Sequence, residues 1–541
     1  MSREKLPLGG MNRRAVLKGG AGLVAGVGIA SLLSNPAFAQ EQVLRIANGG
    51  FDMDWSPLRG GGRVLRWQSF WWATPMYFDS EGALHPYVVT SWEPNADMTV
   101  WTFKVDPAAT FSDGSKITAS DLKGSWEVAA MPSSRHVRIN QVLAGVVGYD
   151  EVTGGTAKDM PGIVAQDDET LVVTLKAADP IFFMRIANEL VPVLKPSEAR
   201  DENGEEVLEW FAPDMGGVTS GPFKLVEMNL DDGFLAFEPN ENFFGKAPKL
   251  TRVEIRSVED PVTATTLLRQ GEFQAHTELV TSTVIDDLGT EFSSGPSIPT
   301  GQHFWFNVNS EPFNDANVRQ AFIMAVDRNG MMQASFPNGP HKQAEQLLVA
   351  VPGVDPDFEP YPYDPAKAKE LLAASSYGGA ESLPRLVMVG IGSPAQKAAA
   401  QFIVEQWRQN LGVSAVELLE RQDNFAPADV HIFRDDIGTR VPDAVAFLAG
   451  GIKTGGGIAS GKMNGYSNPE IDKLLDEAAL LPVDDPQRDE KARAAQKLFR
   501  DDWGYLPWYY ETMSRWALPS VTNMDKNLDW QVVNPWDVTI V

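Results

Sequence analysis

Two short segments of the sequence carry residue types that could do chemistry. Residues 456–462 read Gly-Gly-Ile-Ala-Ser-Gly-Lys, which is close to a P-loop, where glycine amides and a lysine hold phosphate. Met463 stands where that motif needs a Ser or Thr to bind magnesium, and no strong strand pattern precedes the segment. Asp435 and Asp436 are adjacent carboxylates, but adjacency does not give the separation of a catalytic pair. Neither segment therefore predicts catalysis.

Other common enzyme motifs are absent from the sequence. Its six histidines form no H-E-x-x-H, and there is no G-x-S-x-G. With no cysteine, disulfides, thiolate nucleophiles and zinc–thiolate sites are excluded. We expect no catalytic residue, no metal site and no cofactor. An exported hydrolase is the main alternative from another class and would show turnover, whereas a chaperone-like role predicts no saturable site for a small molecule.

Length and charge narrow the class of protein further. A chain of 541 residues is too long for one hydrophobic core and predicts two to four domains. The formal net charge of −26 gives a surface that repels nucleic acids and anionic membranes. We therefore expect neither as a partner, and we expect a monomer.

The first 39 residues read as an export signal. A basic stretch at Asn12–Lys18 contains Arg13 and Arg14, and an uncharged, moderately apolar stretch of about 15 residues follows it. Ala37-Phe38-Ala39 then has the pattern of a cleavage site. The paired arginines resemble a twin-arginine signal, with an ordinary secretory signal as the alternative. We expect a soluble periplasmic protein, and the lack of cysteine argues against a lipoprotein anchor.

Helical and strand patterns alternate through most of the remaining chain. Period-two alternation places Trp101, Phe103 and Val105 on one face of a strand. Thr118, with Asp121 three residues later, has the pattern of a helix N-cap. The strands expected are 43–47, 100–105 and 171–175, and the helices are 64–77, 318–325, one beginning at Pro469 and one at 486–500. The sequence therefore predicts an α/β fold with mixed sheets.

Seven segments, in order along the chain, resemble the family 5 extracellular solute-binding proteins of ABC importers, which include dipeptide- and oligopeptide-binding proteins. Ser220-Gly221-Pro222-Phe223 resembles the family's T-G-P-Y turn, and Asn240–Gly245 resembles its N-x-x-Y-W-G. The other segments are 89–93 with 101–122, 168–171, 180–183, 312–328 and 466–472. One such match would be weak evidence, but seven in order over nearly all of residues 43–541 are strong.

The resemblance implies a two-lobed periplasmic binding protein fold of type II with an extra subdomain in lobe I. The expected ranges are 40–78, 216–302 and 512–541 for lobe I, 79–215 for its subdomain and 303–511 for lobe II. The chain would cross between the lobes near residues 303 and 512, and the crossings would form the hinge. Lobe closure on the solute would present a loaded form to an ABC permease in the inner membrane.

Ligand contacts are expected after the first strand and in the aromatic segment that follows. Two glycines there would permit close approach of the backbone to a ligand. Trp71 belongs to a helical stripe that is more often core, whereas Trp72 would point elsewhere on a helix and is the better candidate. The residues proposed in lobe I are Asn48, Gly49, Gly50, Phe51, Asp52, Trp55, Trp71 and Trp72. A tight loop with solvated side chains is the alternative for residues 48–59.

In lobe II the resemblance points to a region where the sequence departs from the peptide binders. Those proteins carry an Asp before a Pro, which pairs with the ligand's α-ammonium, and Val441 stands at that place. Dipeptide binders also carry an Arg for the ligand carboxylate in the segment that matches 388–393, where this chain has none. Burying an unpaired ligand charge is costly, so both absences argue against a simple free dipeptide. The residues proposed here are Phe433, Arg434, Asp435, Asp436, Arg440 and Asp443.

The class of solute stays open at this point. Asp435, Asp436 or Asp443 could replace the missing carboxylate, and Arg434 and Arg440 could hold a ligand carboxylate or simply be surface charges. The resemblance favours a peptide or peptide-like solute. An oligosaccharide, a glycoside or an opine is the alternative, favoured by the tryptophans and by Val441.

Overall fold

The fold is described from a computed structural model of the whole chain. The residues that it describes are 42–541, except 51–54, 60–62, 80–81, 202–204, 208, 277–296, 338–340, 421–428, 513–515 and 525–533. The proposed signal segment, Phe51 and Asp52 therefore lie outside the described residues.

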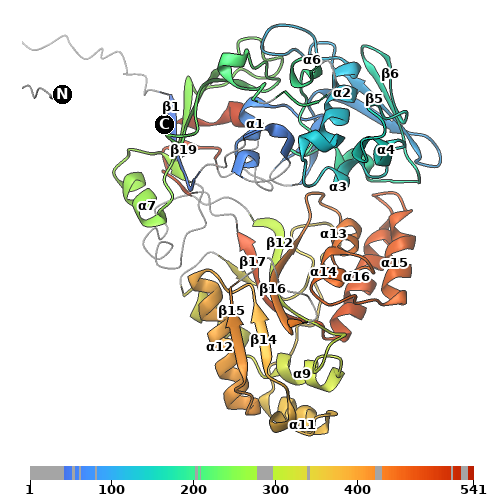
Figure 1. Cartoon of the computed structure of the whole chain (residues 1–541), viewed down its shortest axis with the longest axis vertical. Helices are drawn as coiled ribbons and strands as arrows, with labels where there is room; N and C mark the ends of the chain where they lie inside the picture. The colour runs from blue at the N-terminus through green and yellow to red at the C-terminus, as the bar shows by residue number, and fades with distance from the viewer. Residues whose placement is uncertain are drawn as a thin grey trace, which may run out of the picture. The chain divides into compact units, whose positions relative to one another are not determined.

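A six-stranded mixed sheet forms the centre of the expected lobe I (Figure 1). Its strand order is β18-β11-β1-β10-β9-β8. The central strand β1 pairs in parallel with β10 and β11, whereas β10 and β9, and β9 and β8, are antiparallel. The bounds are β1 Val43–Asn48, β8 Phe223–Asn229, β9 Phe234–Pro239, β10 Arg252–Ser257, β11 Ala275–His276 and β18 Trp516–Ala517, with helix α7 Pro261–Arg269 between β10 and β11.

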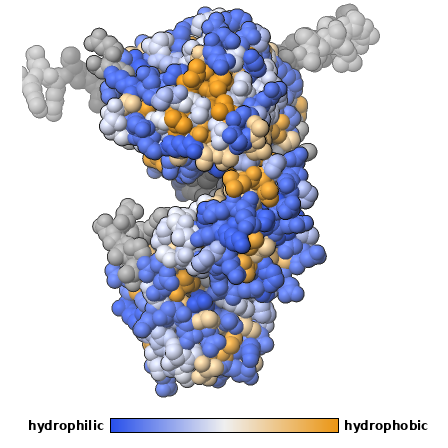
Figure 2. All heavy atoms as spheres, turned by 90° about the vertical axis from the view of Figure 1, so that its right-hand side faces the viewer, coloured by the Kyte–Doolittle hydropathy of each residue, from blue (hydrophilic) through white to orange (hydrophobic). Residues whose placement is uncertain are grey.

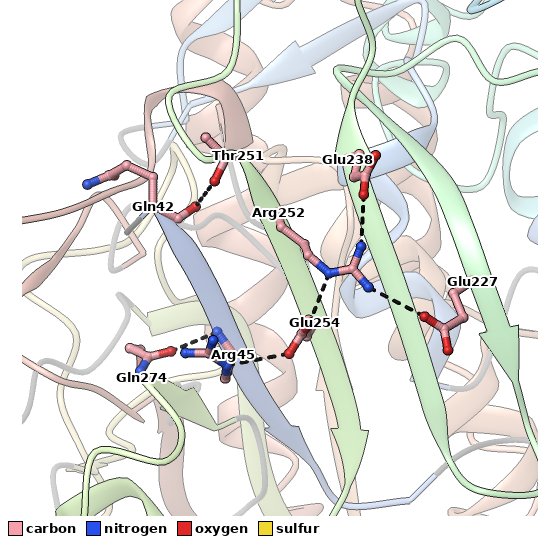
Figure 3. Close-up of polar contacts among 8 residues, drawn as sticks. All are labelled: Gln42, Arg45, Glu227, Glu238, Thr251, Arg252, Glu254 and Gln274. Carbon is pink, nitrogen blue, oxygen red and sulfur yellow. Dashed lines mark hydrogen bonds and ion pairs between the residues drawn. The ribbon is translucent and has the colours of Figure 1, made fainter. Parts of the chain in front are cut away.

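Charged side chains cross-link four strands of this sheet (Figure 3). The guanidinium group of Arg252 on β10 lies 2.9 Å from carboxylate oxygens of both Glu254 and Glu238, and 3.4 Å from Glu227 on β8. Arg45 on β1 reaches Glu254 from the other side at 3.4 Å. Glu227 and Glu238 are at least half exposed, so the network contributes little stability, but it pairs opposite charges across neighbouring strands and favours their register.

The expected subdomain contains its own antiparallel sheet, with the order β4-β5-β7-β6. Its strands are β4 Val89–Pro94, β5 Val100–Val105, β6 Ile163–Asp167 and β7 Thr170–Thr174. Helix α2, Ala119–Ala130, begins with the predicted cap: the Thr118 backbone N–H donates to Asp121 Oδ2 at 2.8 Å, and the Asp121 N–H donates to Thr118 Oγ1. The shorter helices are α3 Asn140–Leu143, α4 Tyr149–Thr153, α5 Phe182–Arg185 and α6 Pro196–Ala199.

A second six-stranded mixed sheet, in the order β13-β17-β12-β16-β14-β15, forms the expected lobe II. Strand β12 lies between β17 and β16 and is antiparallel to both, whereas β14 is parallel to β16 and β15. The bounds are β12 Ser297–Phe306, β13 Lys342–Gln343, β14 Leu386–Val389, β15 Val416–Leu419, β16 Ile432–Gly438 and β17 Tyr505–Thr512. The two longest of these strands, β12 and β17, include the positions at which the chain is expected to cross between lobes.

Helices lie on both sides of this second sheet: α12 lies beside β14 and β15, and α13 to α16 lie on the other side (Figure 1). The bounds are α9 Ala316–Met324, α10 Arg328–Ser335, α11 Pro365–Ala374, α12 Pro394–Leu411, α13 Ala444–Gly451, α14 Gly457–Gly461, α15 Pro469–Ala479 and α16 Pro486–Asp501. The predicted starts of the last two helices are confirmed, because Asn468 and Asp485 cap them and proline follows each cap.

The remaining short elements connect these parts. They are β2 Met76–Phe78, β3 Leu84–Pro86, β19 Val521–Thr522, β20 Thr539–Ile540, α1 Gln68–Trp71, and the 3₁₀ turns η1 Pro57–Arg59, η2 Arg63–Arg66, η3 Pro132–Ser134, η4 Pro213–Met215, η5 Ala380–Ser382 and η7 Pro535–Asp537. The helix expected over 64–77 is found only as the 3₁₀ turn η2 and the single α-helical turn α1, and it is wrong from residue 72 onward, because the backbone of Trp72 is extended and ends α1.

Two large hydrophobic clusters hold the fold together. One runs through the first sheet and the subdomain, from Leu44 to Ile540, and the other runs through the second sheet, from Phe304 to Trp508. The surface is hydrophilic over most of the face drawn in Figure 2, as the charged composition implies. Among the described residues, no helix has the length and apolar character needed to cross a membrane.

Substituting alanine for Gly221 is expected to destabilise the protein by about 1–3 kcal/mol, because overpacking forces a tight contact apart. A Cβ at this position would lie 2.5 Å from the carbonyl carbon of Trp71 and 2.6 Å from the amide nitrogen of Trp72, both backbone atoms. The matched control is Gly145→Ala, since a Cβ at position 145 has no heavy atom within 4 Å. Thermal unfolding measures both variants, and equal melting temperatures would contradict the expectation.

Candidate ligand-binding site

The loop after β1 is held in place by the side chain of Asn48, which is completely buried. Its Nδ2 donates to the carbonyl oxygen of Gly50 at 2.6 Å, and its Oδ1 accepts from Trp67 Nε1 at 3.3 Å. Gly50 has φ = +118°, a conformation that favours glycine, and Gly49 is buried. Asn48 therefore shapes the loop that leads to the proposed contacts Phe51 and Asp52.

Three tryptophans proposed as ligand contacts lie in the core of lobe I. Trp55, Trp71 and Trp72 are each no more than 1% exposed. Because α1 ends at Trp71, the argument that Trp72 points away from the core on a continuing helix is wrong. Its ring instead packs between those of Trp71 and Trp210, with centroid distances of 5.8 and 5.3 Å. These side chains support the fold, and we do not keep them among the proposed contacts.

Asp435 and Asp436 are neighbours on β16, where successive side chains alternate between the two faces of the sheet, and their carboxyl groups still interact with each other. Asp435 forms an ion pair with Lys462, which follows α14, at 2.7 Å, and its carbonyl accepts from the indole of Trp305. The P-loop-like glycines thus lead into a short helix, and the lysine that follows the helix binds a carboxylate. Lys462 Nζ also lies 5.4 Å from the centre of the Phe433 ring, and Phe433 is buried in the lobe II core.

The other face carries a connected group of polar side chains from three neighbouring strands. Arg434 Nη1 donates to Gln302 Oε1 at 2.6 Å, and Gln302 Nε2 donates to Glu511 Oε2 at 3.0 Å. Gln302 is paired across the sheet with Asp436. We call Gln302, Arg434, Asp436 and Glu511 the hinge cluster, since β12 and β17 lie at the expected crossings. The charge of Arg66 acts to lower the pKa of Glu511.

Electrostatics distinguish the two acids of the hinge cluster from ordinary surface carboxylates. Desolvation and the neighbouring Asp435 raise the pKa of Asp436, and desolvation followed by Asp436 raises the pKa of Glu511. Glu511 is buried, whereas the side chain of Asp436 is accessible to solvent. A carboxylate that is both accessible and partly desolvated by surrounding protein fits a concave surface. Asp436 therefore can meet a cationic group of a ligand.

Arg440 and its neighbour Val441 contact lobe I rather than solvent. Arg440 forms an ion pair with Glu189 of the subdomain, and the two side chains are only 15% and 3% exposed. Val441 is 7% exposed and belongs to the hydrophobic cluster of lobe I. The place where peptide binders carry an acid is thus filled by an apolar side chain of the protein itself.

The carboxylate of Asp443 has a structural role in lobe II. Its carboxylate accepts two hydrogen bonds from Arg488, Nε to Oδ2 at 2.7 Å and Nη2 to Oδ1 at 2.9 Å. It also caps α13 by accepting from the Ala446 N–H at 2.7 Å. Both side chains are buried, so Asp443 is not accessible to a solute, and we do not keep it among the proposed contacts.

Several residues of the candidate site were not found from the sequence. Gln302 and Glu511 are far apart along the chain and follow no motif, and they come together because β12 pairs with β17. Glu189 lies in a turn after α5 and likewise follows no motif. Among the described residues, no group of three or more His, Asp or Glu side chains is arranged to hold a metal ion.

The fold matches solved binding proteins over most of its length. The Escherichia coli murein tripeptide-binding protein MppA covers 93% of this chain and 99% of its own, with a TM-score of 0.73 and 23% identity. NikA from Brucella suis, solved with Fe(III)-EDTA, covers 92% of this chain and 100% of its own, with a TM-score of 0.75 and 19% identity. These proteins define a two-lobed α/β binding fold of type II, as predicted.

The chain belongs to the bacterial extracellular solute-binding proteins of family 5, whose model matches residues 83–456. The dipeptide-binding protein DppE of Bacillus subtilis is 26% identical over 444 residues, covering 79% of this chain and 78% of the relative. The periplasmic oligopeptide-binding protein OppA of Salmonella typhimurium is 26% identical over 467 residues, covering 82% of each. The protein is a solute-binding component of an ABC importer and not an enzyme.

Proposed function

We propose that the protein captures a peptide or peptide-like solute in the periplasm and delivers it to an ABC permease in the inner membrane. The relatives named above as dipeptide- and oligopeptide-binding proteins support this solute class. The observation that carries it is Asp436, an accessible carboxylate at the hinge whose pKa is raised by desolvation and by a second acid. Asp436 would then have the role of the acid that peptide binders carry at the position of Val441.

In this proposal the ammonium group of the solute binds Asp436, next to Glu511. Arg434 already donates to Gln302 and to the carbonyl of Gly390 at 3.1 Å, so it orients the cluster. The backbone of the loop at Gly49 and Gly50, with Phe51 and Asp52, supplies further contacts from lobe I. A charged group that leaves water on binding needs such a partner, which is why an acid at the hinge favours a cationic solute.

We also propose that the protein is exported through a twin-arginine signal and that it is a monomer. Arg13 and Arg14 support the export route, and the absence of cysteine from the sequence argues against a lipid anchor. The second candidate is an oligosaccharide, glycoside or opine. It is favoured by Val441, which leaves no carboxylate at the usual ammonium position.

Calorimetric titration of residues 40–541 tests the proposal, with trialanine, N-acetyl-trialanine, maltose and octopine as probes and mass spectrometry of any co-purified solute. We expect trialanine to bind saturably and to raise the melting temperature by mass action, and N-acetyl-trialanine to bind more weakly because it lacks the ammonium. Binding of maltose or octopine without trialanine, or co-purification of such a solute, would contradict the peptide proposal.

A further inference from the structure

Segment 439–443 is rigidly attached to lobe II. The Val441 N–H donates to Thr439 Oγ1 at 3.1 Å, and the Asp443 N–H donates to the Val441 carbonyl at 2.7 Å. Asp443 is then fixed by its buried ion pair with Arg488 on α16. The turn therefore keeps its shape and presents Arg440 and Val441 outward from lobe II.

Glu189 is equally well fixed on the side of lobe I. It is 2% exposed, and its carbonyl oxygen accepts from Nε2 of Gln68, the first residue of α1, at 2.8 Å. The next residue, Leu190, accepts from His136 Nε2 at 3.0 Å through its carbonyl. The backbone that carries the carboxylate is therefore held by hydrogen bonds from two other segments.

We infer that Arg440 and Glu189 form a latch between the lobes that favours their closed arrangement whatever solute is bound. Arg440 pairs with a carboxylate that the protein supplies, while Val441 adds an apolar contact with the lobe I cluster. The pair is shielded from water, so removing one partner leaves a buried charge unpaired and costs more than removing one partner of an exposed pair. Part of the free energy of closure then comes from the protein, and it adds equally to the affinity for every solute that requires closure.

Spin-label distances test the latch without any solute. The chain has no cysteine, so Val164→Cys in the subdomain and Leu480→Cys in lobe II give two specific labels at positions that are 47% and 62% exposed. Open and closed lobes give a longer and a shorter distance between the two labels. In the solute-free protein we expect the shorter, closed-lobe distance to dominate. Glu189→Gln and Arg440→Gln should each raise the ratio of open to closed protein about tenfold, a typical size for a conformational coupling.

Two further variants separate a latch from a loss of structure. The charge reversal Glu189→Arg with Arg440→Glu should restore the shorter distance. Arg385→Gln breaks an exposed ion pair with Glu417 within lobe II and should leave the distances unchanged. Distances that are the same in both single variants and the parent protein, or that change in only one of the two, would overturn the latch.

The same variants distinguish a latch from direct contact with a solute. Trialanine and trialaninamide differ in the C-terminal carboxylate that Arg440 would hold in a direct contact. A latch predicts the same fold-loss of affinity for both probes in Arg440→Gln, and a loss for trialanine alone would overturn it. If neither probe binds, the peptide proposal fails, while the spin-label distances still decide the latch.

Discussion

Asp443→Ala is expected to lower the free energy of unfolding by about 3–5 kcal/mol, because it leaves a buried guanidinium without its carboxylate. Arg488 is 2% exposed in the interior of lobe II, and Asp443 is its only charged hydrogen-bond partner among the described residues. The same substitution removes the cap of α13, at a cost of about 1 kcal/mol that overlaps with the first. Chemical denaturation followed by circular dichroism measures the loss.

Two controls show whether the buried charge is the cause. Replacing both partners, Asp443→Ala with Arg488→Met, should cost less than Asp443→Ala alone, because no unpaired charge is left in the core. Glu417→Ala removes one partner of an exposed pair with Arg385 and should change stability by no more than about 0.5 kcal/mol. A double variant that is less stable than the single variant would contradict the explanation.

The fold could be predicted where local signals agree with the tertiary structure. Thr118 and Asn468 cap their helices as expected, because a capping side chain needs only residues two or three positions away. The prediction for the segment around Trp71 was wrong for the opposite reason. Aromatic residues that are buried on all sides show no reliable period, so the sequence could not indicate that the helix ends before Trp72.

The candidate site could be predicted only to the level of a segment. The resemblance directed attention to residues 433–443, but it did not show which of two adjacent acids faces the hinge, since that depends on the register of β16 against β12. Asp443 could have been recognised as a helix cap from the apolar residues that follow it. Its partner Arg488 lies 45 residues away, and nothing in the sequence indicates that pairing.

Asp436→Asn is expected to weaken binding of trialanine by about 2 kcal/mol, or about 30-fold, because the ammonium loses its charged acceptor. Asn keeps the size of the side chain and removes only its charge, so the fold of β16 should be retained. Calorimetric titration with the parent protein and the variant measures the difference. N-acetyl-trialanine, which has no ammonium, should bind the two proteins equally.

Asp435→Asn is the matched control for this prediction, because it makes the same change at the neighbouring residue, whose carboxylate is already paired with Lys462. It should leave the affinity for trialanine within about threefold of the parent protein, a difference below about 0.7 kcal/mol. An equal loss in both variants would show that negative charge on β16 acts at a distance and not through contact at Asp436.

The pH dependence of binding tests the role of the Asp436 carboxylate independently. The pKa of Asp436 and that of Glu511 are raised in the folded protein, so these acids take up protons at a higher pH than ordinary carboxylates. A protonated acid no longer attracts an ammonium group, and the affinity for trialanine should therefore fall as the pH decreases through the raised pKa values. In Asp436→Asn this dependence should be smaller, because residue 436 no longer titrates. An unchanged pH profile in the variant would place the ammonium elsewhere in the binding site.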